Sequence, residues 1–204
     1  KRQIFPRFRF LSDSQLVSII SHARQPSVTK ELFSLMYPAI KESVIEDEQF
    51  CTGFCSFDGE IFTFREKIWV NPHCVEKWHL QFDEQIILTM KHDLRKLIDQ
   101  QLTDIYKFSN IYPCQTLLLY LNILFTSKVN KVYSTIESLV DKRKETTFEE
   151  MFANLLNNIN NHIKCLEASL EHNCKPQTSN LLLALAKMKD IVHQILNEKL
   201  MTAQ

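Results

Sequence analysis

The chain has 204 residues, enough for one large domain or two small ones, and its 45% hydrophobic and 24% charged residues are typical of a folded globular protein. Its formal net charge is zero, so no global basic field favours nucleic acid or an anionic membrane surface as a partner. Only 2 glycines occur. Because glycine supplies tight turns and phosphate-binding loops, this scarcity predicts long helices, few hairpins and no glycine-built nucleotide site.

The 6 cysteines are too few for a disulfide scaffold, and we expect mostly reduced, buried thiols of an intracellular protein at Cys51, Cys55, Cys74, Cys114, Cys165 and Cys174. No secretory signal opens the chain, and its most apolar stretch, residues 114–125, is too short to span a bilayer. The chain begins without methionine, so we expect it to be an excised fragment of a longer protein.

A capping box predicts where the first helix begins. Ser12 stands at the N-cap and Gln15 three residues later, so each side chain can bond to the backbone amide of the other residue. Leu11 and Leu16 occupy the positions of a hydrophobic staple. The apolar face that should follow consists of Leu16, Val17, Ile19 and Ile20.

A second helix is expected to begin at Pro26 or Ser27, because proline is favoured in the first helical turn, and to end at Tyr37 before Pro38. Its candidate core residues recur at helical spacing and are Val28, Leu32, Phe33 and Met36. The acidic run at residues 46–48 is expected to form a solvated loop.

Residues 51–64 carry the one clear β signal. Asp58-Gly59 lies between two alternating runs and predicts a two-residue hairpin turn with positive φ. The side chains expected to share one face of this hairpin are Cys55, Phe57, Phe62 and Phe64. A lone hairpin is marginally stable in water, so this one should pack on helices.

A long amphipathic helix is the strongest periodic signal. Asn71-Pro72 is expected to cap it, with proline at the first helical position. Apolar residues then recur every three or four positions, at Val75, Trp78, Phe82, Ile86, Met90, Leu94 and Leu97. At 1.5 Å per residue this helix would be a strut of roughly 40 Å.

The rest of the chain predicts a helical bundle. A break is expected at residues 109–113, followed by a helix over 115–141. Thr147 and Glu150 form a second capping box that should open the next helix, and a polar turn at residues 173–179 should lead into the last one. Short connections favour antiparallel neighbours. The predicted fold is therefore mainly α, an elongated multi-helix bundle array with one small β-hairpin, divided into residues 1–70 and 71–204.

A zinc site is the best candidate for chemistry, with Cys51, Cys55, His73 and Cys74 as ligands. The spacing departs from that of zinc ribbons, and four residues along a strand span about 13 Å, so packed apolar cysteines are the better interpretation. A Cys–His nucleophile pair lacks any local sequence signature. We therefore assign no catalytic, cofactor-binding or metal-binding residues.

Several strings resemble the linker of dynein heavy chains. Residues 5–13, FPRFRFLSD, resemble the family's FPRFYFLSN, and residues 14–20, SQLVSII, resemble its continuation DELLEIL. Three further resemblances follow in order: FDGE at 57–60 with Phe64 to the family's hairpin, NPHCVEKW at 71–78 to PGNVEVWL, and IYPCQ at 111–115 to DWPGQ. The sequence departs from the pattern at His73, Tyr112 and Cys114, where the family has Gly, Trp and Gly.

The resemblance implies a mechanical role. In dyneins the linker lies across a ring of ATPase modules and bends and straightens with the nucleotide state, and this swing is the power stroke of a minus-end-directed microtubule motor. The segment itself would be no enzyme and hold no cofactor, since ATP and Mg²⁺ would belong to the parent chain. Its partners would be the ATPase ring in cis, other dynein chains and, through the parent chain, the microtubule, with no nucleic acid and no membrane.

The resemblance also places the protein on the cytoskeleton of the cytoplasm, and we favour an axonemal, ciliary heavy chain. Bending would occur where helices break, at residues 44–50 and 109–113. The alternative is a helical protein-interaction scaffold unrelated to motors, and the predicted hairpin distinguishes the two because a helical repeat scaffold would not need it. An enzyme ranks third, because the sequence shows no convergent polar site.

Overall fold

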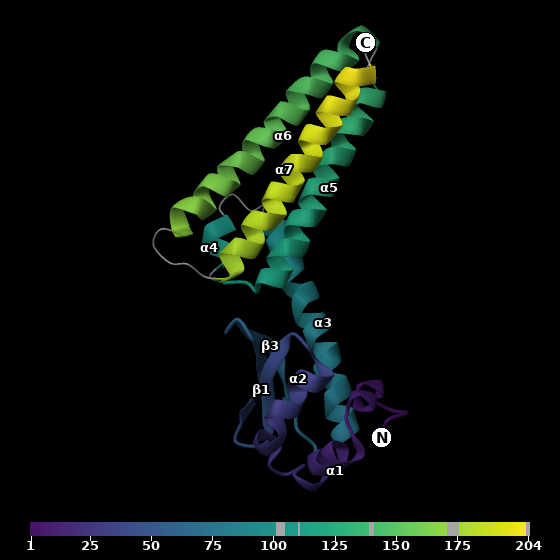
Figure 1. Ribbon diagram of the computed structural model, residues 1–204, viewed down its shortest axis with the longest axis vertical. Coiled ribbons are helices and arrows are strands. Elements are labelled where there is room, and N and C mark those ends of the chain that lie inside the picture. The colour runs from purple at the N-terminus through teal and green to yellow at the C-terminus, as the bar shows by residue number, and fades with distance from the viewer. Residues whose placement is uncertain (101–104, 110, 139–140, 171–175, 203–204) are drawn as a thin grey trace. The chain divides into compact units, whose positions relative to one another are not determined.

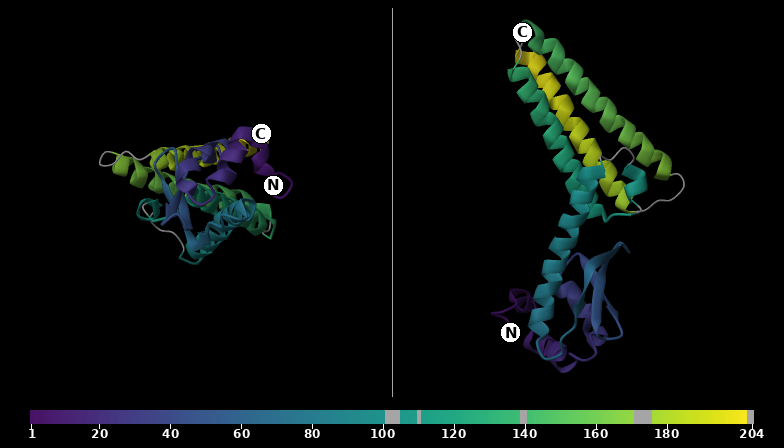
Figure 2. Two further views of the ribbon diagram at one scale, coloured as in Figure 1. Left: turned by 90° about the horizontal axis from the view of Figure 1, so that it is seen from below. Right: turned by 180° about the vertical axis from the view of Figure 1, so that it is seen from behind.

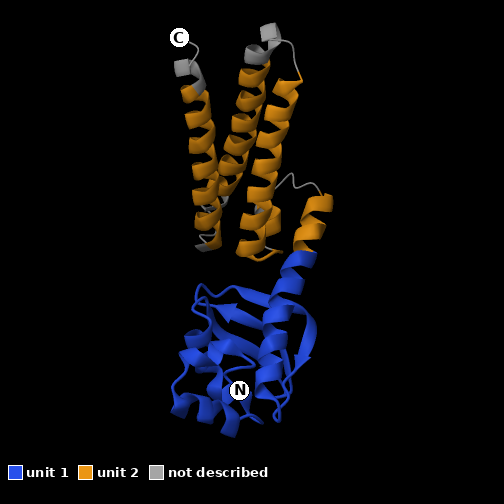
Figure 3. Cartoon of the chain, turned by 90° about the vertical axis from the view of Figure 1, so that its right-hand side faces the viewer, with its two compact units in different colours: residues 1–92 blue, residues 93–204 orange. Residues whose placement is uncertain are grey.

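The computed structural model shows a mainly α-helical protein with one small sheet (Figure 1). The residues that it describes are 1–100, 105–109, 111–138, 141–170 and 176–202. The chain forms two compact units, unit 1 at Lys1–His92 and unit 2 at Asp93–Gln204 (Figure 3). The boundary between the units falls within helix α3, Val75–Gln100, whereas the sequence predicts a domain boundary at residues 70 and 71.

In unit 1, short helices and the first part of α3 pack on a small antiparallel sheet. Its other elements in chain order are the 3₁₀ helix η1 (Pro6–Phe10), α1 (Asp13–Ser21), the 3₁₀ helix η2 (Pro26–Leu32), α2 (Phe33–Met36), β1 (Ile40–Glu46), β2 (Phe50–Ser56) and β3 (Ile61–Trp69). One face of the sheet packs on α3, where the Phe82 ring lies 5.1 Å from that of Phe64 and 6.0 Å from that of Phe54.

The sheet has three strands in the order β1-β2-β3, one more than predicted. The 46–48 run is exposed to solvent as expected, and it forms the tight turn between β1 and β2. Residues 44–50 therefore contain no break between helices. Asp47 and Glu48 adopt positive φ values of 51° and 55°, which glycine usually provides. The Glu48 carboxylate accepts a hydrogen bond from the Ser27 amide at 3.2 Å and another from the Ser27 hydroxyl, and these contacts hold the turn against η2.

The predicted Asp58-Gly59 turn is present, and Gly59 has φ 78°. Its loop is one residue longer than predicted, because Ser56 pairs with Glu60 and the Ser56 amide donates to the Glu60 carbonyl at 2.9 Å. One extra loop residue reverses which side chains face the core. Phe62 and Phe64 are buried as predicted, but Phe57 is 60% exposed, and Cys55 pairs with Ile61 instead of Phe62.

The first predicted helix is confirmed, whereas the second differs from its prediction. The capping box of α1 is confirmed, since the Gln15 amide donates to the Ser12 hydroxyl at 3.2 Å and the Ser12 amide donates to the Gln15 side chain at 2.8 Å. The predicted second helix is mostly the 3₁₀ helix η2, followed by the short α2. Its three-residue period buries Thr29 and leaves Val28 58% exposed.

The long helix α3 is confirmed with its apolar stripe. Val75, Trp78, Phe82 and Leu97 are buried, while Ile86, Met90 and Leu94 pack against the two cores. Its predicted cap is wrong by three residues, because α3 begins at Val75 and the Asn71 side chain instead accepts a hydrogen bond from the His73 amide at 2.9 Å.

Unit 2 is the predicted bundle. It comprises the end of α3, α4 (Ile105–Ser109), α5 (Cys114–Glu137), α6 (Asp141–Leu170) and α7 (Pro176–Thr202). The helices α5, α6 and α7 run antiparallel in succession, as Figures 1 and 2 show, and α6 contacts both α5 and α7. Their buried side chains form one core. No helix in the described ranges is both long and apolar enough to cross a membrane.

Of three predictions about where helices begin in unit 2, one is confirmed and two are corrected. The break before α5 is confirmed, with Pro113 at the N-cap, but α6 begins at Asp141, so Thr147 lies inside this helix and caps nothing. A capping box is a local pattern that a continuing helix can override. Pro176 opens α7, so the predicted turn is helical from there to residue 179, and residues 173–175 lie outside the described ranges.

Gly53 should be needed for the sheet, because a Cβ there would lie 2.1 Å from the Phe62 carbonyl oxygen. We predict that Gly53→Ala lowers the free energy of unfolding of unit 1 by about 1–3 kcal/mol, since the strands must separate to admit the methyl group. Urea unfolding followed by tryptophan fluorescence measures this, because both tryptophans, Trp69 and Trp78, lie in unit 1.

The matched control is Gly59→Asn, because no atom lies within 4 Å of a Cβ built at Gly59 and asparagine tolerates positive φ. It should lower the free energy of unfolding by less than about 1 kcal/mol. Equal effects of the two substitutions would contradict a steric role for Gly53.

Candidate functional site

The four residues considered as zinc ligands, Cys51, Cys55, His73 and Cys74, do not form a metal-binding cluster in the structure. Cys51 is fully buried in the core of unit 1, where its thiol donates to the Gly53 carbonyl at 3.4 Å, and burial raises the pKa of this thiol to about 12. Cys55 donates to its neighbour's carbonyl, and His73 is exposed. Among the residues that the structure describes, no three His, Cys, Asp or Glu side chains are grouped so that they could hold a metal.

A set of side-chain contacts between residues far apart in the sequence joins the start of the chain to α3. We call it the N-terminal junction and define it by residues from η1 and its flank, α2 and its C-cap, and α3: Phe5, Arg7, Phe8, Phe33, Tyr37, Trp78, His79 and Asp83. Two segments that are far apart in the sequence, η1 and α2, thus pack on the same part of α3. The junction has a polar side and an aromatic side.

The polar side is centred on Arg7. Its guanidinium donates to the Met36 carbonyl at 3.2 Å and pairs with Asp83 at 3.4 Å, and it lies 4.5 Å from the centre of the Tyr37 ring. The Tyr37 hydroxyl donates to the other Asp83 oxygen at 2.8 Å. Burial, followed by the nearby Asp83 carboxylate, raises the pKa of Tyr37 far above its ordinary value, so the hydroxyl keeps its proton.

The aromatic side encloses His79. This side chain is 1% exposed, and its ring centre lies 5.3 Å from those of Phe5, Phe8 and Phe33. Neither ring nitrogen has a hydrogen-bond partner among the residues that the structure describes. Burial alone lowers the pKa of His79 to about 3, so the imidazole is neutral at physiological pH.

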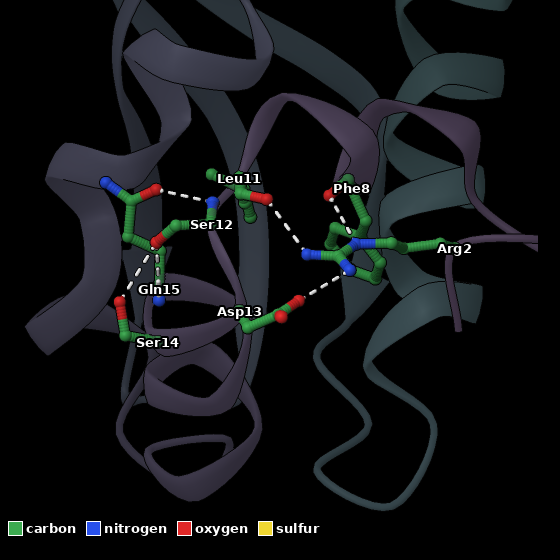
Figure 4. A network of polar contacts seen from close by, with 7 residues as sticks. All are labelled: Arg2, Phe8, Leu11, Ser12, Asp13, Ser14 and Gln15. Carbon is green, nitrogen blue, oxygen red and sulfur yellow. Dashed lines mark hydrogen bonds and ion pairs between the residues drawn. The ribbon is translucent and has the colours of Figure 1, made fainter.

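Two further contacts attach the start of the chain. The Arg2 guanidinium donates to the carbonyls of Phe8 at 3.2 Å and Leu11 at 2.9 Å and pairs with Asp13 at 2.6 Å, beside the Ser12 cap (Figure 4). One arginine thereby ties the end of η1 to the first turn of α1. Lys1 forms an ion pair with the largely buried Glu76 in the first turn of α3.

Residues 1–101, which include the whole junction, match the family model described as dynein heavy chain, N-terminal region 2. Relatives extend the match over the second half of the chain. Dynein axonemal heavy chain 11 of Sus scrofa is 24% identical over 212 residues, covering 100% of this chain and 4% of the relative. The chain belongs to the dynein heavy chain family.

Cytoplasmic heavy chains are also similar to this dynein chain. The cytoplasmic dynein heavy chain of Saccharomyces cerevisiae is 30% identical over 138 residues, which cover 66% of this chain and 3% of the relative. The human cytoplasmic dynein 2 heavy chain 1 is 27% identical over 203 residues, covering 96% of this chain and 4% of the relative. The chain therefore spans only a few per cent of these heavy chains, and the relatives associate it with the cytoskeleton.

The family resemblance in the sequence marked residues 5–13 of this dynein chain but not what they contact. Arg7 and Asp83 are 76 positions apart, and no local pattern pairs them. The only signal in the sequence was the concentration of phenylalanine and arginine within residues 5–10. The structure shows that Phe5 and Phe8 of this run are buried, whereas Phe10 is 68% exposed.

We predict that Tyr37 and Asp83 are energetically coupled. Tyr37→Phe removes one partly buried hydrogen bond and should lower the free energy of unfolding of unit 1 by about 1 kcal/mol. A double-mutant cycle with Asp83→Ala should give a coupling energy of about 0.5–1.5 kcal/mol by urea unfolding with tryptophan fluorescence. Lys67→Ala is the control, because its pair with Glu46 is exposed, and it should change stability by less than about 0.5 kcal/mol. Additive effects of the two junction substitutions would contradict the coupling.

We predict that His79 makes unit 1 sensitive to acid. Between the ordinary imidazole pKa of about 6.5 and the folded-state value of about 3, the unfolded chain binds a proton at His79 that the folded chain does not. Stability is thus unaffected by His79 above the upper value and falls as the pH drops below it. At pH 5 the loss should be about 2 kcal/mol.

The measurement compares urea unfolding of the wild type and His79→Phe at pH 8 and pH 5. Phenylalanine keeps a flat ring but cannot take up a proton, so the variant should lose less stability at pH 5 by about 2 kcal/mol. His22→Gln, which changes an exposed imidazole, should retain the wild-type pH dependence. Identical pH dependence in the wild type and His79→Phe would show that His79 is not the acid-sensitive group.

Proposed function

We propose that this chain is a segment of the linker of a dynein heavy chain and that it transmits the power stroke of the motor. Membership of the family and the ordered resemblance of residues 4–130 to the linker support this proposal. The parent chain would be an ATP-driven, minus-end-directed microtubule motor. Its ATPase ring in cis and other dynein chains would be the partners of this segment.

The observation that carries the proposal is the attachment of the chain's first residues to α3. Phe5 and Phe8 are buried there, and Lys1 and Arg7 form ion pairs with Glu76 and Asp83. A helix of 26 residues holds the backbone hydrogen bonds of its interior within itself and resists bending along its length. Force applied at the start of the chain would therefore reach α3 without passing through the sheet.

The segment itself is proposed to be non-enzymatic, with ATP and Mg²⁺ bound elsewhere in the parent chain. Both glycines have structural positions that a phosphate-binding loop does not use: Gly53 lies in β2 and Gly59 in a hairpin loop. Calorimetry with ATP on this chain and on a C-terminally extended heavy-chain segment tests this. Binding by the extended segment alone is expected, and binding by the 204-residue chain would overturn the linker assignment.

We also propose that the parent heavy chain is located in the ciliary axoneme. The axonemal relative that aligns with 100% of the chain supports this location. A fluorescent tag on the parent heavy chain should therefore label the axoneme, whereas labelling confined to the cell body would favour a cytoplasmic class. The alternative function, a helical interaction scaffold unrelated to motors, is disfavoured for two reasons. The chain belongs to the dynein family, and a helical repeat would not contain its three-stranded sheet.

Arg7→Ala in the full heavy chain should uncouple ATP hydrolysis from movement. The substitution removes the contacts of the guanidinium with Met36, Tyr37 and Asp83, so the start of the chain is held less firmly on α3. We expect microtubule-gliding velocity to fall at least about twofold, as for other losses of a positioning contact, while ATPase turnover stays close to the wild type.

Arg9→Ala is the matched control, since Arg9 lies in the same 3₁₀ helix and is exposed. It should leave both velocity and ATPase turnover unchanged. Equal velocities of the two variants would contradict a role for the junction in transmission. A parallel loss of ATPase turnover with Arg7→Ala would point to a defect in the ring rather than in the linker.

A further inference from the structure

Unit 1 contains a hollow of about 520 Å³ that lies away from the N-terminal junction. It is lined by the last residues of α1, by the segment that follows α1 and by the two residues Pro72 and His73 that precede α3. This volume is in the range of sites that bind small molecules or single side chains of a partner.

The polar side chains that line the hollow are all able to donate hydrogen bonds, and none is a carboxylate: Ser21, His22, Arg24, Gln25 and His73. The Arg24 guanidinium and the His73 imidazole make no hydrogen bond or ion pair with any residue in the described part of the chain. The Ser21 hydroxyl already donates to the Ser18 carbonyl at 3.0 Å. The Arg24 and His73 side chains, which have no partner among the described residues, favour a ligand that consists mainly of acceptor oxygens.

The His22 ring is already oriented. Its Nδ1 lies 3.0 Å from the Ser18 carbonyl oxygen, which only accepts hydrogen bonds, so Nδ1 carries a proton. Nε2 is then left for a ligand. In the neutral ring it can accept a proton from a P–OH group, and in the charged ring it donates to a P–O⁻ group.

Two acidic side chains beside segments that flank the hollow are engaged elsewhere, one at Ser27 and one three positions after His73. Glu48 accepts from the amide and hydroxyl of Ser27 in η2, and Glu76 forms an ion pair with Lys1. Their charges are therefore partly compensated by other partners. The Arg24 charge in the hollow has no such compensation among the described residues.

We propose that this hollow is an anion-binding site for a phosphoryl group carried on a side chain of a polypeptide. Arg24 offers a planar fork that matches two phosphoryl oxygens, and His22 and His73 offer nitrogens for the remaining oxygens. A carboxylate has only two oxygens and would leave donors unused. A free phosphate ion would fill a small part of about 520 Å³, so the volume favours a phosphoryl group with a larger body attached.

The experiment is a ¹⁵N NMR titration of the 204-residue chain at constant ionic strength with four probes. These are inorganic phosphate, acetate, a short peptide with a central phosphoserine and the same peptide with serine. We expect saturable shifts of the amides of residues 21–25 and 73, with the phosphoserine peptide binding more tightly than inorganic phosphate. Acetate and the serine peptide should produce no saturable change.

Arg24→Ala should weaken binding of the phosphoserine peptide by about tenfold or more, and Arg24→Lys should also weaken it, because lysine keeps the charge but not the bidentate fork. Arg9→Ala, at another exposed arginine of unit 1, should stay within about twofold of the wild type. Matching spectra away from the hollow confirm that each variant is folded.

Four results would overturn the proposal. Binding that Arg24→Ala leaves unchanged would place the anion elsewhere, and equal binding of acetate would remove the preference for phosphoryl groups. Binding of inorganic phosphate without the phosphoserine peptide would exclude a polypeptide source. The absence of any saturable shift in residues 21–25 and 73 would exclude the site altogether.

Discussion

The packing of the first residues onto α3 is the contact on which unit 1 depends. Phe5 and Phe8 are buried against His79, and apolar burial of this size contributes roughly 1.5–3 kcal/mol per side chain. A chain end is ordinarily the least ordered part of a domain. Here it lies between α3 and the short helices, because one stacked ring contact, one edge-to-face ring contact and two ion pairs hold it there. Once α3 is fixed in this way, its Phe82 supplies the surface on which the sheet packs.

Three basic side chains at the start of the chain have acidic partners. Lys1, Arg2 and Arg7 each pair with an acidic residue, and two of these pairs reach α3. Ion pairs of this kind add little free energy when exposed, but their geometry fixes which turn of α3 the chain contacts. The neutral His79 at the centre adds no charge. Apolar burial thus supplies stability, and the surrounding charges supply register.

The sheet shows how a small local difference alters what a sequence pattern predicts. Asp58-Gly59 signals a turn correctly, but a loop of three residues rather than two moves Cys55 off the core face and leaves Phe57 exposed. The first strand escaped prediction because its turn has Asp47 and Glu48 at positive φ instead of glycine. That turn is stabilised by Ser27, more than 15 residues away, so no local window of sequence contains its cause.

By itself the sequence determined the mainly helical class, the Ser12 cap, the stripe of α3, the break before α5 and, through its resemblance, the family. Each of these depends on residues a few positions apart, and helical periodicity and capping act over that distance. Only the tertiary structure decided the junction of Arg7 with Asp83, the enclosure of His79, the third strand and the hollow beside Arg24. Most of these features join residues tens of positions apart, and the third strand depends on a turn that distant Ser27 stabilises. Their partners are selected by packing, which a linear pattern does not encode.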